Sequence, residues 1–305
     1  MKLRQILDED AAVLFEEINK GWSSDTKYYI ETKDEEALLL RVSEADTYER
    51  KRSEFEHMKT VAALGIPMSH PLDFVPYDGK VYSLFTWMEG TEAGLVLPQL
   101  AGEEQYQLGF ESGEILKKIH SIPALKETEK WEHYFSRKIN RNIKKYQSCE
   151  LSYEKDEKLL QFISANRHLI KNRPSSFQHG DYHTGNMIIS PNHELAMIDF
   201  NRFDFGDPWE EFNRIVFTAE VSPLFATGQI DGYFSGKPPM EFFKLLALYI
   251  CTNTLNALPW ALSYSQKEVE TMKRQAASVL EWYADMQKII PNWYQGDANK
   301  KYGKK

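Results

Sequence analysis

Residues 177 to 208 read FQHGDYHTGNMIISPNHELAMIDFNRFDFGDP, and this segment combines a short apolar repeat with many acidic and amide side chains. Two apolar runs, residues 187–190 and 195–198, are separated by Pro-Asn-His-Glu. A connection of this length is typical of two antiparallel strands joined by a tight turn. The segment therefore predicts a short hairpin with polar residues at its open end.

The register of this hairpin predicts where its polar side chains meet. If Ser190 pairs with Leu195, then Asn186 lies opposite Asp199, at a Cα separation of about 4.5–5.5 Å. Mg²⁺ prefers oxygen ligands and is commonly held by one or two carboxylates together with substrate phosphates. Asn186 and Asp199 suit such a site. Asp181, in the glycine-flanked loop upstream, is placed to face a substrate hydroxyl and accept its proton.

Composition limits the class of protein. The chain has 305 residues, of which 42% are hydrophobic, with 17 Phe, 16 Tyr and 7 Trp, so it predicts one large or two ordinary globular domains rather than disorder. Two cysteines, Cys149 and Cys251, cannot form a disulfide framework, and we expect a cytoplasmic protein. With 45 acidic against 37 basic residues we expect no nucleic-acid partner. The apolar residues 242–262 predict a buried helix, and we expect no membrane partner.

The first third of the chain predicts a small α+β lobe. Residues 27–32 and 37–43 are β-rich runs around a polar turn, and residues 81–88 form another. Between them, apolar residues at spacings of three and four predict a helix over residues 48–64. The lobe closes near residue 90, and most of the remaining chain has helical patterning.

Three segments of this chain resemble, in order and spacing, the motifs of the aminoglycoside phosphotransferase-like kinases, which include choline and ethanolamine kinases. They are HGDYHTGN at 179–186, Ile-Asp-Phe at 198–200 and Gly-Asp-Pro at 206–208. The resemblance implies an α+β, protein-kinase-like fold of two lobes. Residues 1–88 would form a small, sheet-rich, nucleotide-binding N-lobe. Residues 89–305 would form a large, mostly helical C-lobe with the catalytic loop, the metal site and acceptor-binding helices, and ATP would lie between the lobes.

The same resemblance implies roles for single residues. Asp181 would be the catalytic carboxylate that orients the acceptor, and Asn186 and Asp199 would bind Mg²⁺. His179 and Asp207 would brace the loop.

The resemblance extends to the predicted N-lobe. Arg41 occupies the strand position where the family carries its phosphate-pairing lysine, and arginine keeps the charge and offers two donors to phosphate oxygens. The helix glutamate that would hold Arg41 is Glu54, because it lies four residues before Met58 and seven before Val61, two apolar positions of the predicted helix. Glu56 is the alternative.

Two further segments would contact the nucleotide. Ser23 and Ser24 lie where the family places its phosphate-covering loop, although this chain has one glycine there rather than GxGxxG. Thr86 and Met88, at the end of the third predicted strand, resemble the hinge whose backbone hydrogen-bonds adenine.

The same residues have other possible structural roles. Asp181, Asn186 and Asp199 are also residues that favour ordinary turns. His179 and His183 have the spacing of a zinc-binding helix, but the glycine between them disfavours that helix.

The sequence thus predicts an ATP- and Mg²⁺-dependent kinase that moves the γ-phosphoryl group to a hydroxyl of a small molecule. Cationic, aminoglycoside-like, amino-alcohol-like and sugar-like acceptors all belong to the range implied by the resemblance. Four acidic residues that follow Asp199 could bind an amino group of the acceptor, namely Asp204, Glu210, Glu211 and Glu220. The alternatives are an inactive ATP-binding pseudokinase that acts as a sensor, and a protein kinase, for which the segment after Asp199 is too short to hold a long activation loop.

Overall fold

The computed structural model describes residues 12–19 and 25–303, and its internal contacts divide the chain into two compact units. The first unit combines Met1–Glu92 with Asn186–Asn201. The second combines Ala93–Gly185 with Arg202–Lys305.

The first unit is built on a five-stranded antiparallel sheet in the order β1-β2-β3-β5-β4. Its strands are β1 (Ala12–Glu17), β2 (Thr26–Thr32), β3 (Ala37–Glu44), β4 (Pro71–Tyr77) and β5 (Lys80–Thr86). The predicted strands at residues 27–32, 37–43 and 81–88 are therefore confirmed as β2, β3 and β5. The two edge strands were missed; β4 contains Pro71 and Pro76, which weaken a strand pattern and are tolerated at a sheet edge.

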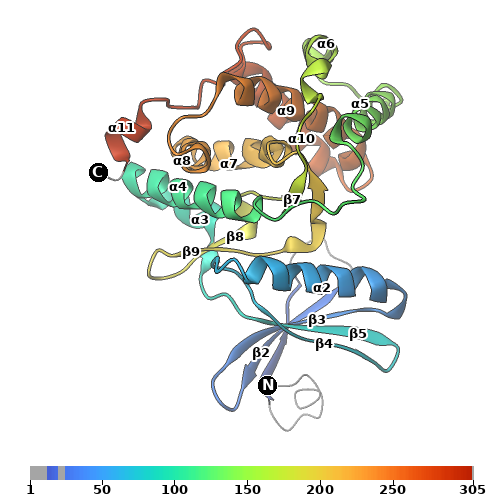
Figure 1. The fold of residues 1–305 in the computed structure, drawn as a ribbon, viewed down its shortest axis with the longest axis vertical. Coiled ribbons are helices and arrows are strands. Elements are labelled where there is room, and N and C mark those ends of the chain that lie inside the picture. The colour runs from blue at the N-terminus through green and yellow to red at the C-terminus, as the bar shows by residue number, and fades with distance from the viewer. Residues whose placement is uncertain (1–11, 20–24, 304–305) are drawn as a thin grey trace. The chain divides into compact units, whose positions relative to one another are not determined.

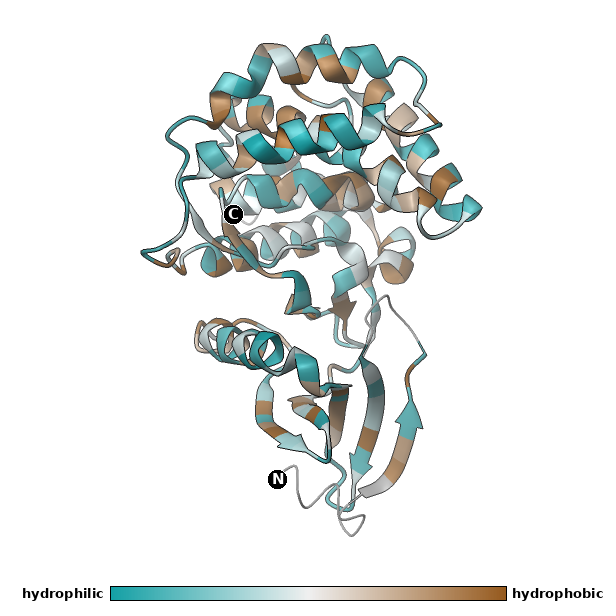
Figure 2. Ribbon diagram, turned by 90° about the vertical axis from the view of Figure 1, so that its right-hand side faces the viewer, coloured by the Kyte–Doolittle hydropathy of each residue, from teal (hydrophilic) through white to brown (hydrophobic). Residues whose placement is uncertain are grey.

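One helix accompanies this sheet, and it confirms the predicted helix. The short 3-10 turn η1 (Ala45–Thr47) leads into α2 (Tyr48–Ala62), which packs against β3, β4 and β5 (Figure 1). Phe55 of α2 contacts Phe74 of β4 and Phe85 of β5 at ring-centroid distances of 5.4 and 5.8 Å. Hydrophilic and hydrophobic residues alternate in bands along the strands (Figure 2), as expected for strands with unlike faces.

The predicted hairpin is present as a pair of short strands. β8 (Met187–Ile189) pairs with β9 (Leu195–Met197), and β6 (Thr91–Glu92) adds to the other side of β8. The Met197 N–H also donates to the Pro67 carbonyl at 2.9 Å. These contacts explain why residues 186–201 group with the first unit, whereas the sequence had placed them within a C-lobe of residues 89–305.

The predicted register of the hairpin is wrong by one residue. Ile189, rather than Ser190, pairs with Leu195. The loop is one residue shorter than expected because His193 adopts a left-handed conformation, with φ 61°, which closes a three-residue turn. Asn186 therefore lies opposite Ile198, whose N–H donates to the Asn186 carbonyl at 3.0 Å.

The second unit is mostly helical, with one small strand pair that carries the loop at residue 179. Its elements are α3 (Ala93–Val96), η2 (Leu97–Gln99), α4 (Gly102–Ile119), α5 (Trp131–Gln147), α6 (Asp156–Asn166), η3 (Arg167–Ile170), β7 (Ser176–Gln178), β10 (Asp204–Gly206), η6 (Glu210–Arg214), α7 (Ile215–Val221), α8 (Pro223–Phe234), α9 (Met240–Leu262), α10 (Gln266–Trp282) and α11 (Ala298–Tyr302). Between β7 and β10 the chain forms η4 (Thr184–Asn186) and η5 (Phe200–Arg202). β7 and β10 are antiparallel, and Gln178 pairs with Asp204.

Helices α4 and α8 approach each other closely through glycines. Gly109 and Gly113 of α4 face Gly228 and Gly232 of α8, and a Cβ atom on any of the four would overlap a backbone carbonyl of the other helix. Glycine is required at these positions because no side chain fits between the two backbones. The backbones of α4 and α8 are therefore in direct contact within the second unit.

Helix α9 is the most apolar segment of the chain. Among the described residues it is the one helix with the length and hydropathy of a membrane span, yet most of it is buried within the protein. It packs against α5, α6 and α10. This confirms the expectation of a buried core helix over residues 242–262.

Candidate active site

Arg41 is the centre of a charged cluster in the first unit. It lies on β3, is 8% exposed, and donates to Asp199 at 2.9 Å and to Glu54 of α2 at 3.4 Å. Burial alone would lower the pKa of Arg41, but Asp199 and Glu54 outweigh it and raise the pKa, so the guanidinium keeps its charge. Glu56, the alternative partner, is exposed and pairs with Lys59 instead.

Three further residues join this cluster and were not predicted. Lys51 of α2 contacts Asp25 at 2.5 Å and Glu54 at 3.3 Å, and Ser43 donates to the other oxygen of Asp25 at 2.9 Å. Burial by itself would raise the pKa of Asp25, but Lys51 and Ser43 together lower it. The sequence held a signal for Lys51, since it lies three residues before Glu54 and so shares its side of the helix.

A third cation lies beside Arg41 on the neighbouring strand. Lys27 of β2 is the direct cross-strand partner of Arg41. Burial, and then the charge of Arg41, lowers the pKa of Lys27. The sheet thus places two cationic side chains, Arg41 and Lys27, close enough to interact with the carboxylate of Asp199, and Lys51 adds a third cation from α2 beside Glu54.

The two residues expected to hold a metal sit at the open end of the β8–β9 hairpin. Asn186 is the last residue of η4, and its carbonyl accepts the N–H of Ile198. Asp199 is the next residue after Ile198. Asp199 lies two residues beyond the end of β9 and has a left-handed backbone, with φ 66°, which is uncommon for residues other than glycine. One carboxylate and one amide oxygen form a donor set that suits Mg²⁺ completed by phosphates and water.

In the second unit, the loop at residue 179 is fixed by its backbone. The Gly180 N–H donates to both oxygens of Glu211, at 3.0 and 3.2 Å, and Gly180 has φ 85°. A Cβ atom there would overlap the carbonyl oxygen of Arg202. The ring of His179 is fully buried, and its Nδ1 accepts the Asp181 N–H at 3.3 Å. These bonds fix the direction in which the Asp181 side chain leaves the loop.

Three cationic or imidazole groups surround the Asp181 carboxylate. Arg214 Nε lies 3.2 Å from Oδ1, His183 Nε2 lies 3.7 Å from the same oxygen, and Arg202 Nη1 lies 3.7 Å from Oδ2. Burial by itself would raise the pKa of Asp181, but His183, Arg214 and Arg202 outweigh it and hold the pKa well below its usual value. Asp181 is therefore an ionised carboxylate, and its side chain is 17% exposed.

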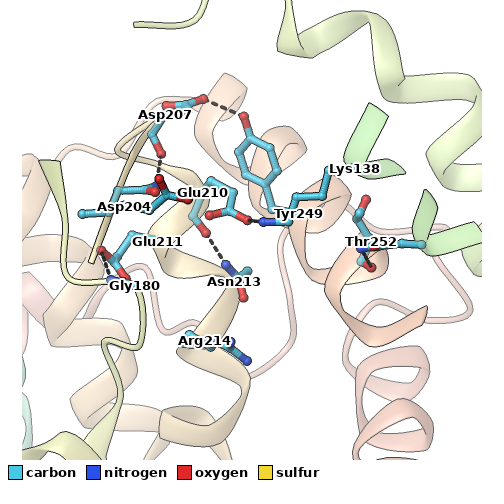
Figure 3. A network of polar contacts seen from close by, with 12 residues as sticks. Lys138, Gly180, Asp204, Asp207, Glu210, Glu211, Asn213, Arg214, Tyr249 and Thr252 are labelled. Carbon is cyan, nitrogen blue, oxygen red and sulfur yellow. Dashed lines mark hydrogen bonds and ion pairs between the residues drawn. The ribbon is translucent and has the colours of Figure 1, made fainter. Parts of the chain in front are cut away.

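Asp207 joins several elements beneath this loop. It is fully buried, accepts two hydrogen bonds from Arg173 at 2.7 and 3.0 Å, and accepts the hydroxyl of Tyr249 at 2.6 Å (Figure 3). Its carbonyl accepts the side-chain amide of Gln178, the residue before His179, at 2.8 Å. Asp207 thus links β7, β10 and α9.

Other members of the second-unit network were not assigned such roles from the sequence. Glu211 accepts the Gly180 N–H (Figure 3). Arg214, three residues later on η6, pairs with the Asp181 carboxylate. Neither contact follows from local spacing, because each joins residues more than 30 positions apart in the chain. A weak signal was available in Glu-Glu-Phe-Asn-Arg, a charged run set directly before an apolar helix.

The remaining sequence-predicted residues are less informative. Ser23 and Ser24 lie outside the described residues. Thr86 ends β5, with its N–H bonded to the His70 carbonyl and its carbonyl accepting the Ser69 hydroxyl. Met88 follows β5 and is half-buried.

The zinc interpretation has no support in the backbone between His179 and His183. That segment is a loop rather than a helix, and each Nδ1 atom accepts a nearby backbone N–H. The two rings are thus held by the loop itself.

An antiparallel sheet with one helix, joined to a mostly helical unit that carries an acidic loop, is the architecture of the kinase-like phosphotransferases. The model of the phosphotransferase enzyme family, APH, matches residues 15–243. The chain therefore belongs to this family, and the resemblance seen in the sequence is confirmed.

Solved structures show the same fold at low sequence identity. A thermostable mutant of aminoglycoside phosphotransferase APH(4)-Ia, in a ternary complex with ADP and hygromycin B, has a TM-score of 0.65 and 15% identity, over 91% of this chain and 97% of that chain. A choline/ethanolamine kinase family protein from Mesorhizobium loti has a TM-score of 0.65 and 13% identity, over 90% and 91%. The amicoumacin kinase hAmiN, in complex with AMP-PNP, Ca²⁺ and Ami, has a TM-score of 0.63 and 12% identity, over 97% and 96%. No curated protein matches the chain.

Proposed function

We propose that this protein transfers the γ-phosphoryl group of ATP to a hydroxyl of a small molecule. The observation that carries the proposal is the ionised carboxylate of Asp181, fixed by a glycine loop that leads directly into the hairpin with Asn186 and Asp199. Family membership and the bound nucleotides named for similar structures support ATP as the donor. A small-molecule acceptor is supported by hygromycin B in one of those structures.

In the proposed reaction, the acceptor oxygen forms a bond to the γ-phosphorus while the bond from that phosphorus to the β–γ bridging oxygen breaks. ADP leaves with the electron pair of that bond, and the hydroxyl proton passes to the Asp181 carboxylate and then to solvent. Because its pKa is low, Asp181 acts mainly by orienting the hydroxyl and stabilising its developing positive charge.

Arg41 is proposed to neutralise phosphate oxygens, with Glu54 fixing its position. Its buried Nε has no hydrogen-bond partner among the described residues, which suits an arriving anionic oxygen. We propose that Asn186 and Asp199 hold Mg²⁺, which when bound offsets the negative charge of the phosphates. The backbone of Met88 is the proposed adenine contact, since the N–H of Thr86 is already bonded to the His70 carbonyl and its carbonyl to the Ser69 hydroxyl.

The test combines MgATP binding with ATP consumption over a broad panel of hydroxyl compounds. A kinase binds MgATP and consumes it faster when its acceptor is present. Binding without stimulation by any acceptor would favour the pseudokinase alternative. Phosphate transfer to protein serines rather than to any small molecule would favour a protein kinase.

A further inference from the structure

The charge around Asp181 is positive, and this bears on the acceptor. Two guanidiniums, on Arg202 and Arg214, face a single carboxylate at 3.7 and 3.2 Å. Arginine stays charged at any physiological pH, so the three groups together carry a net charge of +1 whatever the state of His183. We propose that the acceptor is an anionic hydroxyl compound whose carboxylate or phosphate group is bound by Arg202 and Arg214. This proposal rests on the proposed function.

Both arginines keep donors for a ligand. Each guanidinium has five N–H donors in a planar fork. Among the described residues the ion pairs of Arg202 and Arg214 are made with Asp181 alone, through Nη1 and Nε respectively. Their side chains are 45% and 24% exposed. The other nitrogens therefore suit a second carboxylate or a phosphate in two-point contact.

Two of the four acids suggested for a cationic acceptor, Glu210 and Glu211, are engaged elsewhere. Glu211 is 2% exposed and accepts the Gly180 N–H. Glu210 is 8% exposed and pairs with Lys138 of α5 at 2.8 Å (Figure 3). The sequence-based suggestion that Glu210 and Glu211 receive an amine therefore finds no support, and an amine near Asp181 would meet two arginines.

A half-buried apolar surface lies beside the same carboxylate. The ring of His183 packs against Phe217 of α7 at a centroid distance of 5.4 Å, and both residues are half-buried. Such a surface can contact the carbon skeleton of a small acceptor while the arginines bind its charged end. In this proposal the His183–Phe217 pair contacts the carbon skeleton of the acceptor, while Arg202 and Arg214 bind its anionic group.

A competing account gives the arginines a purely structural role, in which they only keep Asp181 ionised and oriented. The two accounts differ in a measurable way. If the arginines act only on Asp181, Arg202→Gln lowers kcat for every acceptor by the same factor. If Arg202 binds the acceptor, the variant raises KM for anionic acceptors and changes kcat little.

The experiment uses acceptors that share a carbon chain and differ in charge, with wild-type protein and MgATP. One triplet is gluconate, sorbitol and glucamine, and a second is glycerate, glycerol and serinol; within each, the carbon chain is shared and the charge changes. We expect an acid to stimulate ATP consumption at least about tenfold more than its neutral and cationic counterparts, the ratio that corresponds to one ionic contact of about 1.4 kcal/mol. Arg202→Gln should then raise KM for that acid about tenfold or more. Arg137→Gln, at an exposed arginine that pairs with Glu129, is the matched control and should leave KM unchanged.

Each outcome decides the proposal. Equal or greater stimulation by the amines overturns it, as does an equal loss of kcat for all acceptors in Arg202→Gln. If no acid stimulates a protein that binds MgATP and hydrolyses it slowly, the anionic acceptor is wrong while the proposed function stands. If the protein neither binds nor hydrolyses MgATP, the proposed function itself fails.

Discussion

At the level of single residues, the contacts of Asp181 determine the charge and the orientation of its side chain. Its backbone N–H is held by His179 and its carboxylate by Arg214, His183 and Arg202. These contacts keep the side chain ionised and fixed in direction, which is what an orienting group for a hydroxyl requires.

Asp181→Asn should therefore preserve nucleotide binding and lose transfer. Asparagine retains the shape but cannot accept the proton, and such groups typically contribute 10²–10⁴-fold to rate. We expect kcat to fall by roughly that factor while the Kd for MgATP, measured by calorimetry, stays within about twofold. Asp34→Asn is the control, because Asp34 is exposed in the turn between β2 and β3 and has no proposed role in the reaction. Equal losses in both variants would remove Asp181 from the reaction.

Arg41 allows a second test at this scale. Lysine keeps the charge but cannot bridge Glu54 and Asp199 with two nitrogens as the guanidinium does. Arg41→Lys should retain more activity than Arg41→Ala, and both should raise KM for ATP. Steady-state kinetics check this, and two indistinguishable variants would argue against a phosphate contact at Arg41.

At the scale of elements, helix α2 presents a buried charged face to the sheet. Lys51 and Glu54 are each 5% exposed, and with Asp25 they form an ion-paired set. Removing one partner from such a set leaves an uncompensated charge, at a cost of about 3–5 kcal/mol.

Lys51→Met should accordingly lower the free energy of unfolding by about 3–5 kcal/mol. Lys59→Met, on the same helix, is the matched control: Lys59 is half exposed and pairs with Glu56, so we expect a change below about 1 kcal/mol. Urea unfolding measures both. A loss as small as that of Lys59→Met would show that the buried set adds little to stability.

The helix pair α4–α8 gives a separate test. A Cβ atom on Gly232 would overlap the carbonyl of Phe110, so Gly232→Ala should destabilise by at least about 1–3 kcal/mol, despite the better helix propensity of alanine. Gly296→Ala is the comparison, since its Cβ atom would lie 3.5 Å from Tyr294, an ordinary contact. Thermal unfolding of the two variants should separate them clearly; equal midpoints would contradict the close packing.

Local patterns in the sequence predicted the elements better than the links between them. The β8–β9 hairpin was found from its apolar runs, but its register was missed because the left-handed turn at His193 has no apolar signal. Glu54 was found by helical spacing, whereas Lys51 was overlooked because a buried lysine is unusual. Glu211 and Arg214 bind a loop 30 or more residues away, and such pairing depends on tertiary structure.

For the whole molecule, the lowered pKa of Asp181 makes the free energy of unfolding depend on pH. A carboxyl whose pKa is lower in the folded than in the unfolded state stabilises the fold above the unfolded value of 3.8, and this contribution is lost as pH falls toward the folded value. Acidification should therefore cost the wild-type protein stability that Asp181→Asn does not lose.

We expect the wild-type protein and Asp181→Asn to become more similar in free energy of unfolding as the pH falls. The free energy of unfolding of the wild type minus that of Asp181→Asn should fall continuously from about pH 5 downward, with about 1.4 kcal/mol for each unit of pKa shift. Urea unfolding at a series of pH values measures it. A difference that is constant or grows on acidification would contradict the lowered pKa.

The proposed reaction is phosphoryl transfer to a small-molecule hydroxyl, with Asp181 orienting the acceptor. Phosphorus-31 NMR of the protein with MgATP and acceptor compounds tests it most directly, because a phosphomonoester signal reports the new bond itself. We predict a phosphomonoester signal that grows together with that of ADP for the wild type and is almost absent for Asp181→Asn, although both bind MgATP. Bound MgATP that yields no phosphomonoester with any acceptor, or equal yields from both proteins, would contradict the account.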